Sequence, residues 1–264
     1  QAAQMCALLT ILRQGDEIVS SSTLYGGTYS QFDATFRQFG IQTIFVNADD
    51  PDNFRKAITP KTRVIYAETM GNPQINVLDI EAVAKIANEA GVALVIDNTF
   101  ASPYLCQPIR FGADIVIHSA TKFIGGHGTT MGGVVVESGK FPWGNGKYPM
   151  MTEPSRGYHG VIFHETFGDF GYTMKCRMET MRTLGPVLSP FSAWILLQGL
   201  ETLHVRVARH VENAMAVATF LHDHPRVSWV NYPGLPGSKY HALAQKYLPK
   251  GSGSIMTFGI KGGM

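Results

Sequence analysis

Residues 113–126, Ala-Asp-Ile-Val-Ile-His-Ser-Ala-Thr-Lys-Phe-Ile-Gly-Gly, decide how the chain is interpreted. The apolar run at residues 115–117 ends in small hydroxyl residues, one lysine and two glycines, which is typical of a buried strand that delivers a reactive side chain to a loop. Such a lysine is expected to be partly desolvated, which disfavours its charged form and leaves an amine that can form a Schiff base with a carbonyl. Lys122 is therefore the predicted nucleophile. Most lysines after strands are solvated loop residues, so this stretch alone leaves that alternative open.

Apolar runs of the same kind recur upstream of this stretch. They lie at residues 17–21, 41–46, 63–67 and 92–96, and helical patterns such as Ile80–Ala90 separate them. Strands that are apolar throughout and alternate with helices predict an α/β fold with a mostly parallel sheet covered on both faces. Ligands bind such sheets at the carboxyl ends of the strands. The polar residues there are Glu68, Asn72, Asp97 and Lys122.

The end of the chain has a different organisation. A long helical pattern from Pro190 to about His222 is followed by a strand at residues 227–231, a helix at 238–247 and the start of a strand at 254–260. We predict a large domain at residues 1–188 and a smaller α/β domain at 189–264. Because the chain opens within a helical pattern that runs from Gln1 to Gln14, and stops before a closing helix, both domains are expected to be incomplete.

The composition excludes several functional classes. The 264 residues are 45% hydrophobic and 16% charged, with a formal charge of +2 and no basic stripe, so neither nucleic acid nor a membrane is the predicted partner. No apolar run is long enough to span a bilayer, and no signal peptide is visible. Three widely separated cysteines, Cys6, Cys106 and Cys176, suggest no disulfide framework and fit a reducing cytoplasm.

Residues 139–171 form an unusually long connection. They are rich in glycine, proline and aromatic residues, including Trp143, Tyr148, Tyr158 and Phe163. A connection of this length predicts a lid or a contact with a partner.

Asp97 closes the apolar run at residues 92–96 and precedes a turn. The commonest role for an aspartate there is a helix cap. A metal site is not predicted, because no companion ligand follows at a suitable spacing. The sharper interpretation pairs Asp97 with Lys122, which follows the next strand of the same sheet.

Four motifs together resemble the pyridoxal-phosphate enzymes of cysteine and methionine metabolism. They are Tyr25-Gly-Gly-Thr-Tyr29, Glu68-Thr-Met-Gly-Asn-Pro73, Asp97 and Ser119-Ala-Thr-Lys122, in that order. The resemblance covers essentially the whole chain and implies the aminotransferase-like fold (fold type I), with a large cofactor-binding domain and a smaller C-terminal one. Residues 143–144 and 157–159 make the chain most similar to the O-acetylhomoserine sulfhydrylases (aminocarboxypropyltransferases) within that family.

The resemblance implies catalytic roles for three residues. Lys122 would form a Schiff base with pyridoxal 5'-phosphate and then move protons on the substrate. Asp97 would pair with the pyridine nitrogen, which keeps it protonated and makes the ring an electron sink. Tyr25 would stack on the ring near the reacting carbon; taken alone, it could equally be a turn residue packed on the core.

The remaining implied residues would hold the cofactor. Asn72 would hydrogen-bond the ring hydroxyl, Ser119 and Thr121 would bind the phosphate, and Gln1 would offer a backbone N–H at a helix start. Taken one at a time, these residues also have structural explanations. Asn72 could be a turn residue before proline, and Ser119 and Thr121 could cap the next helix. Glu68 lies beside the site in the family, in a supporting role.

The implied reaction is a γ-replacement that converts O-acetylhomoserine and sulfide, or a small thiol, to homocysteine, or an analogue, and acetate. Cystathionine γ-synthase and methionine γ-lyase activities are the alternatives within the family. Outside it, alternatives are a nucleotide-binding dehydrogenase, which would need a Gly-x-Gly-x-x-Gly turn, and an inactive assembly module. The resemblance also implies a homotetramer of close dimers, and family residues outside the chain that bind phosphate and substrate, so the isolated chain is expected to bind the cofactor poorly.

Overall fold

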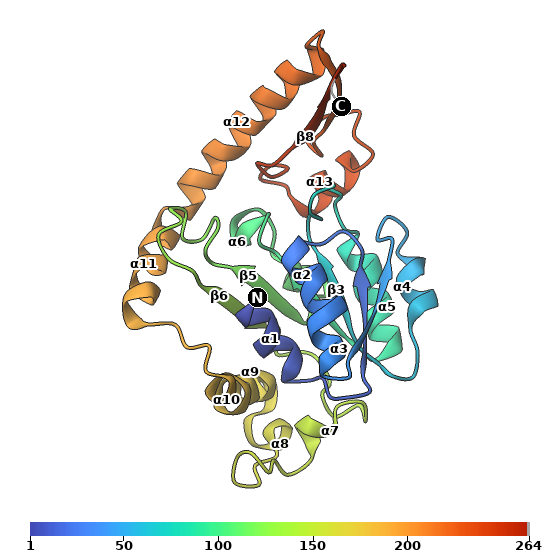
Figure 1. Ribbon diagram of the computed structural model, residues 1–264, viewed down its shortest axis with the longest axis vertical. Helices are drawn as coiled ribbons and strands as arrows, with labels where there is room; N and C mark the ends of the chain where they lie inside the picture. The colour runs from blue at the N-terminus through green and yellow to red at the C-terminus, as the bar shows by residue number, and fades with distance from the viewer. Residues whose placement is uncertain (263–264) are drawn as a thin grey trace.

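A six-stranded sheet forms the centre of the protein (Figure 1), in a computed structural model that describes residues 1–262. Its strand order is β2-β1-β3-β4-β5-β6, and only β6 runs antiparallel to its neighbour. The strands are β1 Glu17–Ser21, β2 Gln42–Val46, β3 Thr62–Glu68, β4 Ala93–Asp97, β5 Ile115–Ser119 and β6 Gly133–Glu137. The predicted α/β class with a mostly parallel sheet is confirmed.

The strands are apolar throughout because each contributes to two cores. In β3, Val64 and Tyr66 belong to one core, whereas Ile65 and Ala67 belong to the other. Successive side chains of a strand point to opposite faces, so a sheet covered on both sides needs an apolar residue at nearly every position.

Helices cover both faces of this sheet. One face packs against α4 Asp52–Ala57 and α5 Ile80–Ala90, and the other against α1 Ala2–Leu9 and the segment after α2. The other short helices of the large unit are α2 Gly26–Ser30, a π-helical turn Gln31–Thr35, α3 Phe36–Gln38, α6 Ser102–Leu105 and a 3₁₀ turn Pro108–Phe111. The predicted helix from Gln1 to Gln14 is wrong in length: α1 ends at Leu9, where the Thr10 hydroxyl donates to the Cys6 carbonyl oxygen at 2.6 Å.

The long connection at residues 139–171 is part of the core, so its interpretation as a lid is wrong. Trp143, Tyr148 and Phe163 are buried in the core that contains α1, and the Tyr148 hydroxyl accepts from the Ala93 N–H at 2.8 Å. The aromatic content therefore serves packing against the sheet. The helices here are α7 Pro149–Thr152, α8 Phe163–Phe167 and a 3₁₀ turn Gly168–Phe170, followed by α9 Gly171–Lys175, a π-helical segment Cys176–Met181 and α10 Arg182–Leu184.

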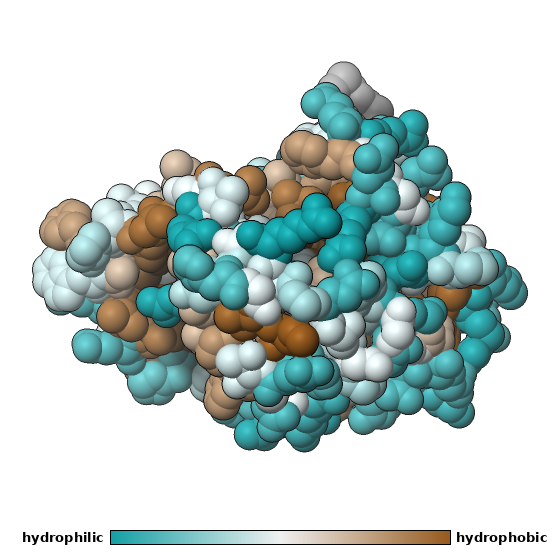
Figure 2. All heavy atoms as spheres, turned by 90° about the horizontal axis from the view of Figure 1, so that it is seen from below, coloured by the Kyte–Doolittle hydropathy of each residue, from teal (hydrophilic) through white to brown (hydrophobic). Residues whose placement is uncertain are grey.

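The C-terminal part packs on the large unit. It contains α11 Pro190–Glu201, α12 Leu203–Asp223, β7 Val227–Asn231, α13 His241–Tyr247 and β8 Thr257–Ile260, with β7 and β8 antiparallel. Leu203 and Val207 enter the core that contains α5, and the Tyr240 hydroxyl donates to Asp49 at 2.7 Å. The outer side of α11 carries exposed apolar side chains, visible as brown atoms at the left of Figure 2.

The predicted single helix from Pro190 to His222 is interrupted at Thr202. The Gly199 carbonyl oxygen accepts from the Arg206 guanidinium at 2.6 Å and from the Thr202 hydroxyl at 3.3 Å. Side chains that insert into the backbone ladder in this way break or bend a helix.

Gly199 also lies against the loop that follows β5. A Cβ atom there would be 2.2 Å from the Gly125 carbonyl oxygen. We therefore expect Gly199→Ala to lower the free energy of unfolding by about 1–3 kcal/mol, the usual cost of overpacking, as measured by urea denaturation. Gly237→Ala is the matched control, because a Cβ at Gly237 would have no atom within 4 Å. Equal stability of the two variants would contradict this close contact.

Candidate active site

One cavity of about 1140 Å³ lies at the carboxyl ends of the strands. Residues at the ends of β3, β4 and β5 line it, among them Glu68, Asp97 and Ser119, and the carboxyl ends of the strands are the usual ligand position in sheets of this kind. All seven residues predicted to act or to bind the cofactor line this one cavity: Gln1, Tyr25, Asn72, Asp97, Ser119, Thr121 and Lys122.

Asp97 is the last residue of β4 and is held by the turn that follows. Its Oδ1 atom accepts from the Thr99 N–H at 2.9 Å and from the Thr99 hydroxyl. Asp97 therefore forms a side-chain turn with Thr99, and the predicted alternative of a helix cap is wrong. Burial raises the pKa of the Asp97 carboxyl, and the Thr99 hydrogen bonds oppose that rise. Thr99 was not predicted, although Asp97-Asn-Thr after a strand is a recognisable turn sequence.

Glu68 lies beside Asp97, since the two residues are paired in register at the ends of β3 and β4. Its Oε1 atom accepts from the Tyr25 N–H at 2.7 Å, which fixes the start of α2 at the cavity wall. Burial, together with the nearby charge of Asp97, raises the pKa of Glu68 to about 8. One carboxyl of this pair is therefore protonated at neutral pH.

The raised pKa of Glu68 predicts a pH-dependent stability. Unfolded Glu68 ionises near its ordinary pKa of 4.5, but the folded group keeps its proton until about pH 8. The cofactor-free protein should therefore lose stability relative to Glu68→Gln as the pH rises through this interval, by a total on the order of 3–5 kcal/mol. Urea denaturation across the interval measures the difference, and parallel profiles for the two proteins would contradict a buried, protonated Glu68.

The loop that carries Lys122 is held by its backbone. The Gly126 N–H donates to the Lys122 carbonyl oxygen at 2.7 Å, and the Gly125 N–H donates to the Ala120 carbonyl oxygen at 2.8 Å. Gly126 has a φ of +76°, which favours glycine. The Lys122 side chain is exposed on the cavity wall, so the expectation that it is partly desolvated is wrong for this structure. The cavity that Lys122 lines has a volume of about 1140 Å³.

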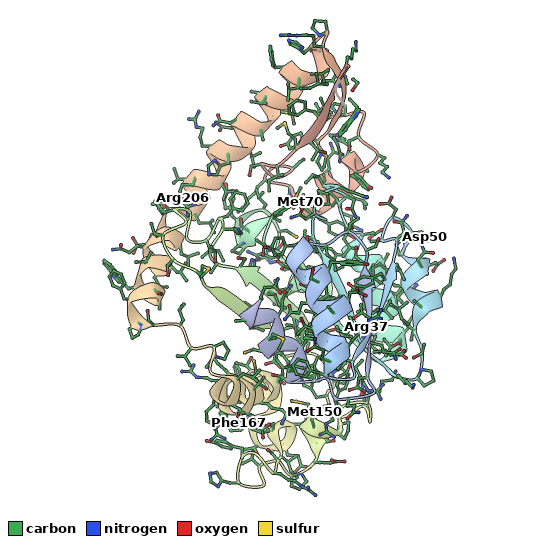
Figure 3. All side chains as sticks on the ribbon, viewed as in Figure 1. Arg37, Asp50, Met70, Met150, Phe167 and Arg206 are labelled. Atoms are coloured by element: carbon green, nitrogen blue, oxygen red, sulfur yellow. The ribbon has the colours of Figure 1, made fainter. Side chains whose placement is uncertain are left out.

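Arg206 from α12 clamps the same loop, a role that the sequence did not indicate (Figure 3). Its guanidinium donates to the carbonyl oxygens of Phe123 at 2.8 Å and Ile124 at 3.2 Å, directly after Lys122. The same group binds Gly199 of α11 at 2.6 Å. Arg206 is therefore a positioning residue that connects the lysine loop with the junction of α11 and α12.

The predicted phosphate ligands come from the start of α1, the end of β5 and the loop that follows β5. Gln1 is the N-cap residue of α1, and Ser119 ends β5. The Thr121 hydroxyl accepts from the Gly132 N–H at 3.0 Å, which ties the lysine loop to the chain before β6. Hydroxyls beside a helix N-terminus make a suitable set of donors for an anion.

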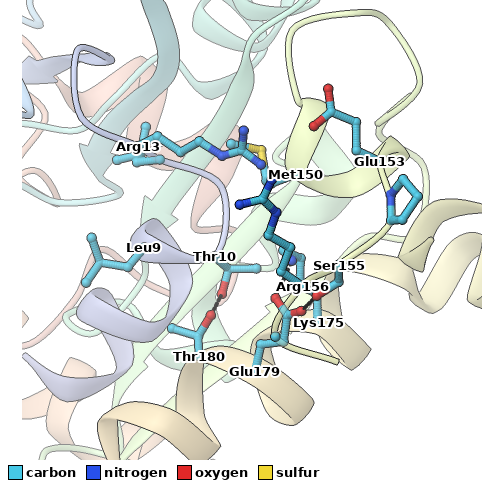
Figure 4. A pocket seen from close by; sticks show the side chains of 13 residues that line it. Leu9, Thr10, Arg13, Met150, Glu153, Ser155, Arg156, Lys175, Glu179 and Thr180 are labelled. Atoms are coloured by element: carbon cyan, nitrogen blue, oxygen red, sulfur yellow. Dashed lines mark hydrogen bonds and ion pairs between the residues drawn. The ribbon is translucent and has the colours of Figure 1, made fainter. Parts of the chain in front are cut away.

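A second pocket, of about 520 Å³, contains none of the predicted residues (Figure 4). It lies between the end of α1 and the π-helical segment, and its lining includes Arg13, Arg156 and Lys175. Lys175 is paired with Glu179, whose carboxylate also accepts from the Ser155 hydroxyl. We therefore assign the active site to the larger cavity.

An amine, a buried carboxylate and an aromatic side chain line one cavity at the carboxyl edge of a mostly parallel sheet, which defines an α/β protein with a cavity suited to a cofactor. The donors fit pyridoxal phosphate, because Asp97 can face a ring nitrogen and the start of α1 can face a phosphate. The profile of the Cys/Met metabolism PLP-dependent enzymes matches residues 1–264, and the chain belongs to that family.

Two curated relatives and one solved structure illustrate the similarity. The chain is 54% identical to O-acetyl-L-homoserine sulfhydrylase of Leptospira meyeri, over 100% of this chain and 62% of the relative. It is 50% identical to homocysteine/cysteine synthase of Saccharomyces cerevisiae, over 99% of this chain and 60% of the relative. A crystal structure from Campylobacter jejuni, assigned as an O-acetylhomoserine (thiol)-lyase with a pyridoxyl-lysine monophosphate, superimposes with a TM-score of 0.93 at 35% identity, over 98% of this chain and 65% of that one. The chain thus spans about three fifths of the curated relatives that it matches.

Proposed function

We propose that the full-length protein catalyses a γ-replacement that converts O-acetylhomoserine and sulfide to homocysteine and acetate. The observation that carries the proposal is the convergence of Lys122, Asp97 and Tyr25 on one cavity, in a chain about half identical to sulfhydrylases and homocysteine synthases. In the net reaction the Cγ–O bond breaks, acetate leaves with the electron pair, and sulfide supplies the pair for the new Cγ–S bond.

We assign the proton transfers to residues of this chain. Bound pyridoxal phosphate supplies an aromatic ring that accepts the electron pair released at the substrate carbon. The Lys122 amine takes protons from the substrate carbons and returns them, for which an exposed position in the cavity is suitable. The Asp97 carboxylate, oriented by Thr99, holds a proton on the ring nitrogen. Tyr25 lines the same cavity, and its phenol would stack on the bound ring near the reacting carbon.

Four residues would hold the cofactor in position. Asn72 would bind the ring hydroxyl, whereas Ser119, Thr121 and the backbone at Gln1 would bind the phosphate. The support for these assignments is that all four line the same cavity as Lys122.

A substrate comparison tests the proposal in the full-length protein. We expect acetate release that depends on sulfide, and little α-ketobutyrate from methionine. Predominant α-ketobutyrate formation would instead favour a methionine γ-lyase, and a preference for cysteine over sulfide would favour a cystathionine γ-synthase. A protein that gains no visible absorption band with pyridoxal phosphate would be an inactive assembly module.

We further propose a homo-oligomer, a tetramer of close dimers, in the cytoplasm. The support for association is an exposed apolar strip next to and on α11, formed by Val187, Phe191, Trp194 and Leu197, each at least half exposed. Among the helices of residues 1–262, none combines the length and apolar character that crossing a bilayer requires. Light scattering after gel filtration measures the oligomeric state.

The division into domains at residues 1–188 and 189–264 also remains a proposal. The separate β7–β8 sheet supports a second unit, whereas the packing of Leu203 and Val207 into the first core ties the two together. Limited proteolysis near residue 188 would test this boundary.

A further inference from the structure

Two cysteines far apart in the sequence meet in the wall of the active-site cavity. Cys6 lies in α1 and is 6% exposed, whereas Cys176 begins the π-helical segment and is partly exposed. Both residues line the cavity that contains Lys122, and their side chains are close enough to interact. Neither thiol has a role in the proposed reaction.

The elements that carry the two thiols are fastened to each other. The Tyr172 hydroxyl donates to the Ala7 carbonyl oxygen at 3.0 Å, one residue after Cys6. The hydroxyls of Thr10 and Thr180 are hydrogen-bonded at 2.9 Å, as the dashed line in Figure 4 shows. Ala7 and Thr10 lie within four residues of Cys6, and Tyr172 and Thr180 each lie four residues from Cys176, so these contacts fasten the two thiol-bearing segments to each other.

The environment makes the two sulfur atoms chemically unequal. The interaction with the Cys6 thiol lowers the pKa of Cys176 in spite of burial, and Cys176 is also the more exposed of the two residues. The interaction with Cys176, and then burial, raise the pKa of Cys6 well above its ordinary range. Cys176 is therefore the thiol that reacts first with an oxidant, and Cys6 is placed to react second.

We propose that Cys6 and Cys176 form a reversible intramolecular disulfide when the protein meets a hydroperoxide. In the first step the Cys176 thiolate attacks a peroxide oxygen, so that an S–O bond forms, the O–O bond breaks, and water or an alcohol leaves. In the second step the Cys6 sulfur attacks the Cys176 sulfur, the S–S bond forms, and the oxygen leaves as water. Each cysteine loses one electron, and the peroxide is reduced by two.

Cys106 provides an internal comparison. It is buried at 2% exposure in the opposite core, where burial raises the pKa of its thiol to about 12. It does not line the cavity, so it should stay reduced under conditions that oxidise the pair.

The test treats the reduced full-length protein with hydrogen peroxide and maps its peptides by mass spectrometry. We expect the peptides of Cys6 and Cys176 to appear joined, about 2 Da lighter than their sum, and to separate after dithiothreitol. Cys176→Ala and Cys6→Ala should abolish the joined species, whereas Cys106→Ser should retain it. The far-ultraviolet circular dichroism of each variant verifies that it is folded.

Two results would overturn the proposal. In one, Cys176 is converted to a sulfinic acid, about 32 Da heavier, with no joined peptide. In the other, the joined peptides occur only between two protein molecules. The wild-type map decides between these results and the expected one even if a variant fails to fold, and it does not depend on which amino acid the enzyme converts.

Discussion

Lys122→Ala in the full-length protein should lower kcat/KM by at least about 10³-fold, because the substitution removes both the covalent attachment and the amine that moves protons. Treatment of the wild-type protein with pyridoxal phosphate and borohydride should leave a phosphopyridoxyl group on the peptide that contains Lys122. The variant should carry no label on that peptide. Peptide mapping and an acetate-release assay measure the two effects.

The matched control is Lys85→Ala. Lys85 is a surface residue of α5 whose side chain is 75% exposed and lies 4.0 Å from Glu89, so its loss should leave activity and labelling unchanged. Full activity in Lys122→Ala, or a label on another lysine of the wild-type chain, would refute the assignment of Lys122.

Asp97→Asn should lower kcat/KM by about 100-fold or more, because it removes the negative charge that holds a proton on the cofactor ring. The shape of the site should survive, since an asparagine oxygen can still accept from the Thr99 N–H that binds Asp97 at 2.9 Å. The loss should therefore fall mainly on kcat. Steady-state kinetics and thermal unfolding together separate a loss of charge from a loss of structure.

Asp33→Asn is the control for this substitution. Asp33 is a surface residue whose ion pair with Arg37 is exposed, so the variant should retain activity. The assignment of Asp97 fails if Asp97→Asn keeps wild-type kinetics, or if Asp97→Glu, which preserves the charge, is no more active than the asparagine variant.

The sequence predicted the parts of the fold that depend on local patterns. The strand at residues 17–21 and the helix Ile80–Ala90 match β1 and α5, because continuous apolar runs and a glycine after the last helical turn are local signals. The convergence of Asp97 and Lys122 also followed from the pattern, since parallel strands end at the same edge of a sheet.

Features that depend on distant contacts escaped prediction. Arg206 reaches a carbonyl group 83 residues earlier in the chain, and no local pattern announces that contact. The aromatic residues at 139–171 look the same in a lid as in a core, and only the sheet beneath Trp143 distinguishes the two. The exposure of Lys122 depends on segments far apart in the sequence, because the cavity that it lines is formed by residues from Gln1 to Ile255.

The Arg206 clamp has a mechanical consequence. Its guanidinium holds both the segment after Lys122 and the Gly199 carbonyl beside the break at Thr202. A rotation of α12 about that break must therefore either move the backbone of residues 123–124 or break these hydrogen bonds. Movement of the C-terminal unit is thus coupled, through Arg206, to the position of the Lys122 backbone.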